Sequence, residues 1–559
     1  MSIQKIKIIN FKTFERFELE FDSGLNILVG DNEVGKSTVI EAIHLVLTGI
    51  LNGKPLNTEL TQYLFNNTAV NKYLESIVKG QPIEPPAIRI ELFFNESDDV
   101  AITKGRINID SEDACGIALV ISLNDDNGEY AELLKSDTEI KTLPIEYYEI
   151  KWSTFADKFI TTKSVPIKSA LIDSSLARYQ NGSDIYISRI VRQGLEPSEI
   201  VNVSQAHRRM REHFMKDKSI EAINERLKEN ASISDKNVAL SVELLSKNAW
   251  ENSLVTYIDE VPFQYIGKGE QCIIKTKLAL ADKKAKKASV ILMEEPENHL
   301  THTRLNQLIE TISTQCQDRQ IIISTHSSFV ANKLGIDSLT LLGNNGVKTK
   351  ISDLNDSTSV FFKKLSGYDT LRLVLSKKTI LVEGASDELI VQRAYMDSHD
   401  GRLPIEDGVD VISVGTSFLR FLEIADKLMK PVAVVTDNDG KIDALEKKYS
   451  DYLGDKKKDN ILISFDTEDR TPSDKPLNNY NYNTLENLLL AVNNKTNLNN
   501  IFNTKYDSDD ELRKYMKAHK TECALAIFDY SENILYPKYI KEAIAHVCEQ
   551  VDCSCRRVG

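Results

Sequence analysis

Apolar and polar residues alternate through the first twenty positions of the chain, and a short apolar run follows. Residues 3–10 and 16–21 alternate in the manner of half-exposed strands. Residues 25–29 form a mainly apolar run of the kind found in buried strands, and residues 39–47 have the apolar spacing of a helix. The pattern therefore predicts a strand, a loop and a helix, in this order, around residues 30–38.

Further along the chain, the pattern changes from strands to long helices. Strand-like runs at residues 87–94, 117–123 and 145–150 predict a mixed sheet. Residues 189–229 are rich in Arg, Glu, Lys and His with helical apolar spacing, which predicts exposed helices that form an arm or a dimerisation insert. The basic run at 207–211 either contacts DNA phosphate or is a solvated helix face, which is the commoner meaning of such a run.

Buried parallel strands are predicted again in the second half of the chain. Apolar runs at 288–293 and 321–323 are separated by a helix at 305–315. A repeated β-α pattern then begins near residue 378, with strands expected at 379–382, 410–414 and 432–436 and helices at 387–397 and 417–428. Sheets of this kind bind ligands at the carboxyl ends of their strands, so the residues that follow each strand are the candidates for chemistry.

Composition excludes some classes of protein. The 559 residues carry a formal net charge of −14, which argues against a wholly basic nucleic-acid coat but allows a local basic groove or bound cations. The sequence contains no run of about 18 apolar residues and no evident signal peptide, so we expect a cytoplasmic protein without a membrane partner. Seven scattered cysteines fit a reducing compartment.

Zinc is the alternative for the cysteines near the carboxyl terminus. The residue types of a zinc site occur there at irregular spacing, at His546, Cys548, Cys553 and Cys555. Structural zinc sites usually have a Cys-x₂₋₄-Cys knuckle, so a tail of reduced thiols is the simpler interpretation.

Residues 30–38, Gly-Asp-Asn-Glu-Val-Gly-Lys-Ser-Thr, have the pattern of a phosphate-binding P-loop. Its glycines let several N–H groups point into one hollow, and the following helix adds the partial positive charge of its amino terminus. Lys36 is expected to reach the β- and γ-phosphates of ATP, and Ser37 to hold Mg²⁺. The expected nucleotide ligands are Gly30, Asn32, Gly35, Lys36, Ser37 and Thr38. The alternative is a chance match on a glycine turn, which the strand-loop-helix context disfavours.

An acidic pair follows the strand predicted at 288–293. Glu294 is expected to contact Mg²⁺ beside the nucleotide, and Glu295 to orient or deprotonate the attacking water. His326 follows the next strand and is expected to touch the γ-phosphate, although a lone histidine is more often structural. The three residues therefore predict an ATPase.

A glycine motif precedes the acidic pair. Gly267-Lys268-Gly269 stands before a helix, and with the motifs above it resembles the ABC-type ATPases, whose signature loop caps the nucleotide of the opposite subunit. Gly267 occupies the usual serine position, and Lys268 would supply charge instead. The resemblance implies a homodimer or higher homo-oligomer, and residues 8–14 and 24–30 are similar to the DNA-repair and SMC/RecF-like branch.

Carboxylates also follow two predicted strands in the last third of the chain. Glu383 and Asp387 follow one strand, and Asp437 and Asp439 follow another. Like charges repel, so their convergence requires a reason, and one or two Mg²⁺ or Mn²⁺ ions supply it. Such ions activate water and stabilise a leaving oxygen. The alternative for residues 437–440 is a simple turn.

These residues look like a Toprim domain, and an ABC-type ATPase followed by a Toprim domain resembles the OLD (overcoming lysogenisation defect) family. This family of ATP-linked nucleases includes the Gabija nuclease subunit and retron-associated effectors. The resemblance implies that Glu486, in Thr-Leu-Glu, is a further metal ligand. It also implies a catalytic lysine near the carboxyl terminus, for which Lys520 is the first choice and Lys538 the second.

The expected fold class is α/β, with an ABC-type P-loop ATPase head, a helical dimerisation insert and a Rossmann-like Toprim nuclease domain. The expected segments are 1–165 and 255–350 for the ATPase, 166–254 for the insert, 351–377 for a linker helix, and 378–559 for the Toprim domain with carboxyl-terminal helices.

The resemblance implies a metal-dependent DNA endonuclease or nickase, regulated by the ATPase and active in bacterial defence against phage. A helicase or a retron RNA or DNA is a further partner that the family implies. Two rivals are a Toprim topoisomerase or primase, and an SMC-like DNA-repair clamp with an inactive Toprim domain. The sequence leaves open which nucleic acid is cut and whether ATP activates or inhibits cutting.

Overall fold

The computed structural model of the chain divides into two compact units. They comprise residues 1–26 with 37–324, and residues 27–36 with 325–559. The structure describes residues 1–124, 130, 140–173, 179–180, 183–184, 195–230, 256–281, 289–298, 300–315, 319–327, 330, 335–343, 346–364, 368–472, 477 and 480–549.

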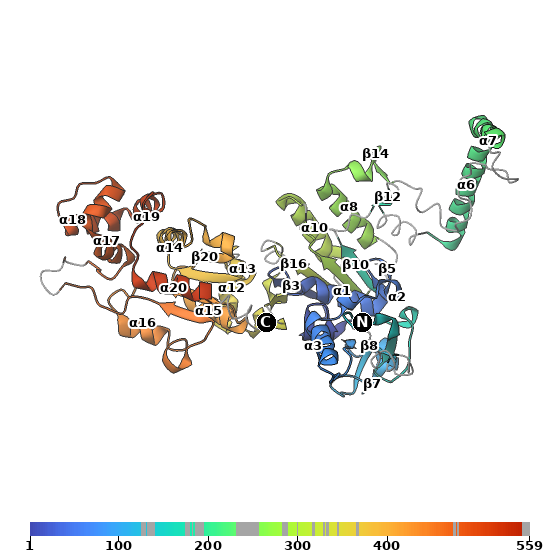
Figure 1. Cartoon of the computed structure of the whole chain (residues 1–559), viewed down its shortest axis with the longest axis horizontal. Coiled ribbons are helices and arrows are strands. Elements are labelled where there is room, and N and C mark those ends of the chain that lie inside the picture. Colours follow the sequence, from blue (N-terminus) through green and yellow to red (C-terminus); the bar gives the residue numbers. More distant parts are fainter. Residues whose placement is uncertain are drawn as a thin grey trace. The chain divides into compact units, whose positions relative to one another are not determined.

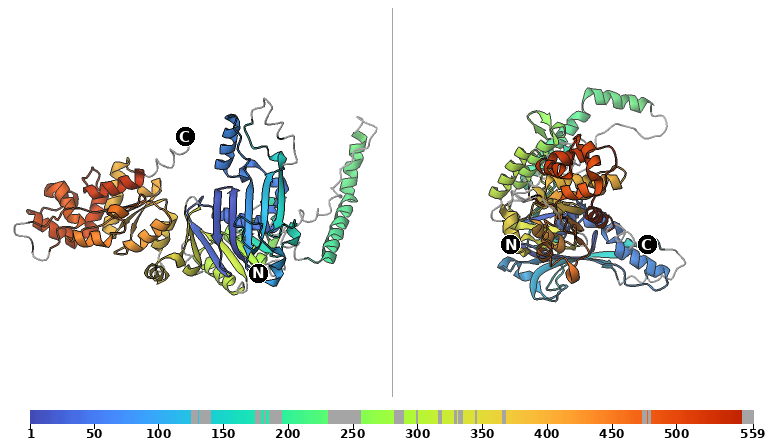
Figure 2. Two further views of the ribbon diagram at one scale, coloured as in Figure 1. Left: turned by 90° about the horizontal axis from the view of Figure 1, so that it is seen from below. Right: turned by 90° about the vertical axis from the view of Figure 1, so that its left-hand side faces the viewer.

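The first unit contains a mainly antiparallel sheet at its amino-terminal end. Its strands lie in the order β2-β1-β6-β8-β7, with β9 paired to β8, and the blue and cyan strands of Figure 2 show them side by side. The strands are β1 (Ile3–Phe11), β2 (Phe14–Glu20), β6 (Ile88–Phe94), β7 (Lys104–Gly105), β8 (Ala114–Leu123) and β9 (Tyr148–Thr154). The short helix α2 (Leu56–Glu59) and helix α3 (Asn67–Val78) lie between β3 and β6 along the chain. The sequence pattern thus predicts β1, β2, β6, β8 and β9 to within a few residues, but it does not predict the two-residue β7.

A second sheet carries the strands that precede the predicted ATPase motifs. Its order is β10-β15-β16-β3-β17-β18. The strands are β3 (Leu25–Gly30), β10 (Ser169–Asp173), β15 (Val290–Glu294), β16 (Gln320–Thr325), β17 (Leu339–Leu342) and β18 (Lys348–Lys350). Along the chain, helix α1 (Lys36–Thr48) follows β3, α8 (Lys268–Ala281) precedes β15, and α10 (His302–Gln315) lies between β15 and β16. The central residues of β15 and β16 are buried, as their unbroken apolar runs predict.

The predicted insert differs from the structure at its start. Strand β10 lies within the segment 166–254 but pairs in parallel with β15, so it belongs to the ATPase sheet. Helices α6 (Pro197–Met215) and α7 (Lys218–Asn230) agree with the predicted long helices and contact each other. Residues 174–178, 181–182, 185–194 and 231–254 of this segment lie outside the described residues.

The region predicted to be a Toprim domain, called the Toprim region here (described residues between 378 and 549), is built on a four-stranded parallel sheet of order β20-β19-β21-β22. The strands are β19 (Lys378–Val382), β20 (Val409–Ser413), β21 (Val432–Val435) and β22 (Ile461–Ser464). The helices are α14 (Ala385–Ser398), α15 (Phe418–Lys427), α16 (Ile442–Lys448), α17 (Leu485–Phe502), α18 (Asp509–Ala518), α19 (Lys520–Phe528) and α20 (Lys538–Glu549), and Figure 1 shows α17, α18 and α19 grouped together.

Two pairs of helices cover this sheet. Helices α14 and α20 contact each other and the sheet, while α13 (Tyr368–Leu375) and α15 form a second pair that also contacts the sheet. Ile380 and Val382 belong to the buried cluster that includes α14, α17 and α20. Successive strand residues face opposite sides, so Leu381 is buried on the other face. This arrangement leaves the ends of the strands for the site.

Two helices lie in the segment 351–377, for which the sequence predicts a single linker helix. Helix α12 (Asp356–Lys364) ends before residues 365–367, which lie outside the described chain, and α13 follows. Phe362 of α12 packs edge-on against Phe421 of α15, with ring centroids 5.5 Å apart. Arg372 of α13 donates hydrogen bonds to both carboxylate oxygens of Asp410, at 3.0 and 2.6 Å. The linker is therefore docked on the Toprim sheet.

Among the described helices, none is both long and apolar enough to cross a membrane.

Candidate functional site

The P-loop lysine, Lys36, forms hydrogen bonds to the backbone of its own loop. Lys36 is the first residue of α1, is only 5% exposed, and donates from Nζ to the carbonyl oxygens of Gly30 at 2.9 Å and Asp31 at 2.8 Å. Both of these acceptors are neutral carbonyl oxygens, and an ammonium at the amino terminus of a helix suits an incoming phosphate. Asn32 and Ser37 are exposed at the loop, and Thr38 is buried.

Both glycines of the loop have a physical reason to be glycine. A Cβ at Gly30 would lie 2.6 Å from the carbonyl oxygen of Leu342 and 2.8 Å from Cγ2 of Val34, so β3 and β17 could not remain as close as they are. Gly35 has a φ of 97°, in the left-handed region that favours glycine. The loop geometry therefore depends on the residues that the sequence motif contains.

The acidic pair follows β15, and His326 follows the neighbouring strand β16. Glu294 is the last residue of β15, and Glu295 has a positive φ of 42°. The Glu295 backbone N–H donates to the Ser324 carbonyl at 3.0 Å, and its carboxylate accepts from Asn298 Nδ2 at 2.9 Å. His326 is exposed at the end of β16. The backbone of Glu295 is therefore in the left-handed region, a strained conformation of the kind that clusters at functional sites.

The predicted signature loop lies at the start of α8. Gly267 immediately precedes the helix and is exposed, and Lys268 and Gly269 form its first residues. Gln271 holds the loop, because its Nε2 donates to the carbonyl oxygens of Phe263 and Ile266, both at 2.9 Å. The motif is therefore presented on a braced helix amino terminus.

In the Toprim region, two predicted carboxylates follow β19. Glu383 is exposed directly after the strand, and Asp387 lies in the first turn of α14. Asp387 Oδ2 accepts a hydrogen bond of 2.8 Å from the backbone N–H of Gly384. Burial, followed by the charges of Glu486 and Glu383, raises the pKa of Asp387 to about 6, although the Gly384 hydrogen bond and Lys520 act in the opposite direction.

Asp437 follows β21, the parallel neighbour of β19, so both strands deliver their carboxylates to the same edge of the sheet. The backbone N–H of Leu485 donates to Asp437 Oδ2 at 3.2 Å. Burial raises the pKa of Asp437 well above its usual value, and the charges of Asp387, Glu486 and Glu383 raise it further. Residues from three parts of the chain are thus close enough to act on one another's protonation.

Asp439 and Glu486 complete the predicted carboxylate set. Asp439 is exposed on a turn with a positive φ of 51°, and its Oδ1 accepts a hydrogen bond of 2.7 Å from Asn481 Nδ2. Glu486 lies in the first turn of α17, where Thr484 Oγ1 donates to its Oε2 at 2.7 Å. Each carboxylate thus accepts a hydrogen bond from a neutral side chain.

The structure distinguishes the two candidate lysines. Lys520 Nζ lies 2.8 Å from Glu486 Oε1. Burial would by itself lower the pKa of Lys520, but the Glu486 hydrogen bond and the charges of Glu486, Asp437 and Asp387 together raise it. Lys538 instead pairs with Glu542 one helical turn away at 3.1 Å, with 89% of its side chain exposed. The structure therefore brings Lys520 to the carboxylates and does not bring Lys538 to them.

The donor set fits a divalent cation in its chemistry. Carboxylate oxygens are the ligands that Mg²⁺ and Mn²⁺ prefer, and a cation would stabilise the charged forms that burial disfavours at Asp387 and Asp437. As the side chains stand in the described residues, no three His, Cys, Asp or Glu side chains converge tightly enough to form a metal site. This edge of the sheet therefore contains suitable metal ligands, but these side chains do not form a complete coordination sphere in the described residues.

Sequence reasoning missed the polar residues that support these carboxylates. The stretch 481–487 contributes Asn481, Thr484, the Leu485 N–H and Asn487, whose Nδ2 donates to Thr484 Oγ1 at 3.0 Å. Asparagines in a loop are normally solvated, so neither spacing nor composition marks them as functional. The one available signal was the Thr-Leu-Glu element itself, which contains Thr484 and Leu485 and is flanked by Asn481 and Asn487.

The carboxyl-terminal zinc alternative receives no support from the described residues. Cys548 Sγ lies 3.4 Å from His399 Nε2, and the buried Nε2 of His546 has no hydrogen-bond partner there. Cys553 and Cys555 lie outside the described residues.

Two family models match the chain. One described as an AAA domain matches residues 5–320, and one described as "Overcoming lysogenization defect protein-like, TOPRIM domain" matches residues 374–439. The second match contains Glu383, Asp387, Asp437 and Asp439. These matches confirm the predicted α/β class, an ATPase followed by a Toprim domain.

The curated relatives are proteins of DNA repair. The DNA replication and repair protein RecF of Clostridioides difficile is 23% identical over 246 residues, which is 42% of this chain and 62% of the relative. RecF of Alkaliphilus oremlandii is 34% identical over 79 residues, 14% of this chain and 20% of the relative. The DNA double-strand break repair Rad50 ATPase of Thermoplasma acidophilum is 49% identical over 49 residues, 9% of this chain and 6% of the relative. The chain thus spans under two thirds of each.

Solved structures with some similarity include SMC heads. The SMC head domain from Thermotoga maritima is 13% identical with a TM-score of 0.30, over 62% of this chain and 98% of that chain. The Smc head with an extended coiled coil from Pyrococcus furiosus, bound to the C-terminal domain of ScpA, is 13% identical with a TM-score of 0.34, over 63% of this chain and 97% of that chain.

Proposed function

The chain belongs to the AAA domain family and carries an OLD-like Toprim domain, a combination that supports ATPase and nuclease activity, and from this premise we propose a metal-dependent DNA endonuclease or nickase regulated by its ATPase. One observation carries the proposal. At one edge of the Toprim sheet, the charges of Glu383 and Glu486 help to raise the pKa of the buried Asp387 and Asp437. A folded protein keeps such a repulsive set where a cation is to be bound.

The proposed reaction is hydrolysis of a phosphodiester. Water attacks the phosphorus atom, the bond from phosphorus to one sugar oxygen breaks, and that oxygen leaves with a proton from solvent. Bound Mg²⁺ or Mn²⁺ supplies activation of the water and neutralisation of phosphate charge. Asp387, Asp437, Asp439, Glu383 and Glu486 are the oxygen ligands that would hold it.

Lys520 has a separate role in this proposal. Its ammonium lies against Glu486, so the positive charge stands beside the carboxylate edge rather than in bulk solvent. Once a cation satisfies Glu486, the lysine is available to steady the negative charge that develops on a phosphate oxygen. Lys538, paired with Glu542 on an exposed helix surface, has no such role.

The ATPase is proposed to regulate cutting rather than to drive it, because phosphodiester hydrolysis is favourable without ATP. Lys36 and Ser37 bind the phosphates and their Mg²⁺, Glu294 assists the metal, Glu295 orients water, and His326 senses the γ-phosphate. Gly267-Lys268-Gly269 would cap the nucleotide of a second copy, so ATP binding would assemble a homodimer or a larger homo-oligomer.

DNA is the proposed substrate, since the relatives are named for DNA replication and repair. We further propose a cytoplasmic role in defence against phage, with a helicase or a retron RNA or DNA as a second component. This part depends on the likeness of the Toprim segment to the overcoming lysogenization defect protein.

A plasmid assay tests the proposal. Supercoiled plasmid is incubated with the full chain and Mg²⁺ or Mn²⁺, with and without ATP, beside Glu383→Gln and Lys36→Ala variants. Nicked or linear DNA that disappears in Glu383→Gln supports a nuclease. Relaxed closed circles would instead indicate a topoisomerase, and intact plasmid with ATP turnover would indicate a clamp with an inactive Toprim domain; either result overturns the proposal.

A further inference from the structure

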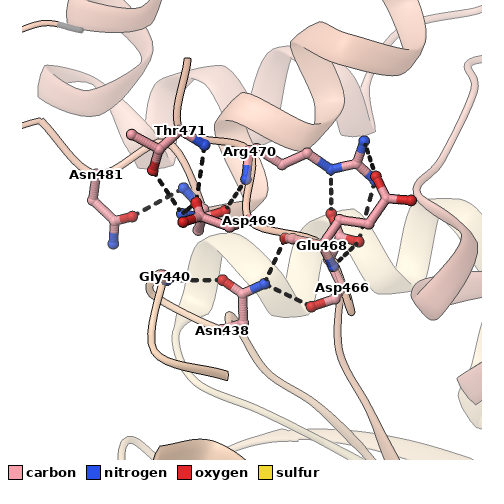
Figure 3. Close-up of polar contacts among 9 residues, drawn as sticks. Asn438, Gly440, Asp466, Glu468, Asp469, Arg470, Thr471 and Asn481 are labelled. Atoms are coloured by element: carbon pink, nitrogen blue, oxygen red, sulfur yellow. Dashed lines mark hydrogen bonds and ion pairs between the residues drawn. The ribbon is translucent and has the colours of Figure 1, made fainter. Parts of the chain in front are cut away.

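A buried asparagine ties the turn after β21 to the loop after β22. Asn438, only 3% exposed, donates from Nδ2 to the carbonyl oxygens of Asp466 at 2.6 Å and Glu468 at 3.0 Å (Figure 3). Its Oδ1 accepts from the backbone N–H of Gly440 at 2.9 Å. The side chain of Asn438, between Asp437 and Asp439, is therefore buried and links the turn to the loop after β22.

A second buried asparagine, Asn483, also forms hydrogen bonds to the loop after β22. Asn483 is 2% exposed, donates from Nδ2 to Asp469 Oδ1 at 2.8 Å, and accepts at Oδ1 from the backbone N–H of Arg470 at 2.6 Å. A Cβ added to Gly440 would lie 3.0 Å from Asn483 Nδ2, so the turn and this amide are packed together. Loop, turn and Asn483 thus form one hydrogen-bonded unit.

A third asparagine, Asn481, links this hydrogen-bonded unit to Asp439, a predicted metal ligand. Asn481 Nδ2 donates to Asp439 Oδ1 at 2.7 Å. Asn481 is itself held, because its Oδ1 accepts from the Asn483 backbone N–H and its carbonyl oxygen accepts from Asn487 Nδ2, both at 2.9 Å. Asp439 is otherwise an exposed side chain on a turn, free to sample several rotamers. The amide selects one orientation of its carboxylate.

The same stretch of chain also reaches the other carboxylates. The Leu485 N–H bonds Asp437 Oδ2 at 3.2 Å, and Thr484 Oγ1 bonds Glu486 Oε2 at 2.7 Å. Residues 481–486 therefore contact both aspartates of the turn and include the glutamate. A change in the path of this stretch would move three predicted ligands together.

We propose that Asn481 and Asn483 are positioning residues for the metal-binding carboxylates. Asn481 orients the Asp439 carboxylate, and Asn483 fixes the backbone on which Asn481 and Glu486 stand. A neutral amide suits this task, because it donates to one carboxylate oxygen and leaves the other oxygen for a cation. The inference rests on the proposed function, since it assigns these carboxylates to a metal.

The test measures metal binding directly. Mn²⁺ is titrated calorimetrically into the full chain without nucleotide, for the wild type, Asn481→Ala and Asn483→Ala. We expect Mn²⁺ affinity to fall about tenfold in each variant, at the lower end of the effect of removing an outer-sphere partner. The Mn²⁺ concentration for half-maximal plasmid cleavage should rise by the same factor, with ATP hydrolysis unchanged.

Asn493→Ala is the matched control. Asn493 in α17 is 3% exposed, and its side chain bonds the carbonyl oxygens of Leu489 and Leu535 and the Leu535 N–H. Its loss should lower the melting temperature as Asn483→Ala does, without changing Mn²⁺ affinity. Asn481 is only partly buried, so Asn481→Ala carries the test if Asn483→Ala fails to fold.

The outcomes separate this inference from the proposed function. Wild-type Mn²⁺ affinity in Asn481→Ala overturns the positioning role, even if the wild type cuts DNA. A wild type that binds Mn²⁺ but leaves DNA intact overturns the nuclease, while the variant affinities still decide the positioning role. A wild type that binds no Mn²⁺ overturns both.

Discussion

The P-loop and the carboxylate edge of the Toprim sheet solve opposite electrostatic problems. At the P-loop, a buried ammonium is held by neutral carbonyl oxygens from its own loop, all within seven residues. At the Toprim edge, carboxylates between residues 383 and 486 lie close together, and burial raises the pKa of two of them. The P-loop is suited to bind an anion, and its geometry is determined by neighbouring residues in the sequence. The Toprim edge needs a cation, and its geometry depends on tertiary structure.

The difference predicts how each site responds to a neutral isostere, and Asp437→Asn should have the largest effect. The amide oxygen can still accept the Leu485 hydrogen bond, so the fold is retained, but a buried ligand charge is lost. We expect DNA cleavage to fall about 10³-fold, because metal-borne charge stabilisation is lost. Plasmid cleavage measures this, and ATP hydrolysis should be unchanged.

Asp451→Asn is the control for this substitution. Asp451 is an exposed aspartate of the same domain that pairs with Lys456 at 2.6 Å. Cleavage should continue at the wild-type rate in this variant. Equal activity of Asp437→Asn and Asp451→Asn would remove the carboxylate edge from the chemistry.

Lys36→Ala tests whether the two sites can be separated. Removal of the ammonium leaves the phosphates without their charged partner, so ATP hydrolysis should fall about 10²-fold or more. Cleavage in the absence of nucleotide should be retained, because the Toprim carboxylates do not depend on Lys36. Phosphate release and plasmid nicking, measured on one preparation, check both parts. Loss of nucleotide-free cleavage would show that the sites are obligatorily coupled.

Lys520→Met, with Lys538→Met as its control, sharpens the comparison within the Toprim region. Lys520 lies 2.8 Å from Glu486, whereas Lys538 pairs with Glu542 on an exposed helix. We expect Lys520→Met to slow cleavage about 10- to 100-fold through loss of one charged contact to phosphate. Single-turnover cleavage at saturating Mg²⁺ measures the effect, and Lys538→Met should match the wild type. The reverse ranking would assign the role to Lys538.

The sequence predicts the P-loop more completely than the carboxylate edge, because the P-loop residues are neighbours in the sequence and the carboxylates are brought together only by tertiary structure. The P-loop motif is contiguous, so spacing alone identifies Gly30, Gly35 and Lys36 and the strand and helix around them. Glu383 and Asp437 are found because residues after parallel strands share one sheet edge, which is a rule of topology rather than of contact. Asn438, Asn481 and Asn483 could not be found, since their role depends on a loop folded against a turn.

The fold shows a similar division. Unbroken apolar runs predict β15, β16, β19 and β21 to within two residues, because a strand buried on both faces has little compositional freedom. Strand β10 was missed, since five residues with two charged or polar ends carry no period of their own. It is a strand because β15 offers a free edge in the folded sheet, which is tertiary information.

The smallest expected effect concerns stability and pH. The pKa of Asp387 is about 6 when folded and near 3.8 when unfolded, mainly because burial disfavours its charge. A raised acid pKa means that the folded state binds more protons between these values, so stability falls as pH rises from about 4 through about 6 and is then level. Asp387→Asn mimics the neutral form and retains an acceptor for the Gly384 N–H.

We therefore expect Asp387→Asn, with metal chelated, to raise the melting temperature by about 2–4 °C at pH 7.5 and to change it little at pH 4. Excess Mg²⁺ should reverse the order at pH 7.5, because the wild-type carboxylate gains a partner that the amide replaces poorly. Thermal unfolding at both pH values, with and without Mg²⁺, measures this. The same gain at pH 4 as at pH 7.5 would mean that the substitution acts through packing and not through the charge of a carboxylate kept for a cation.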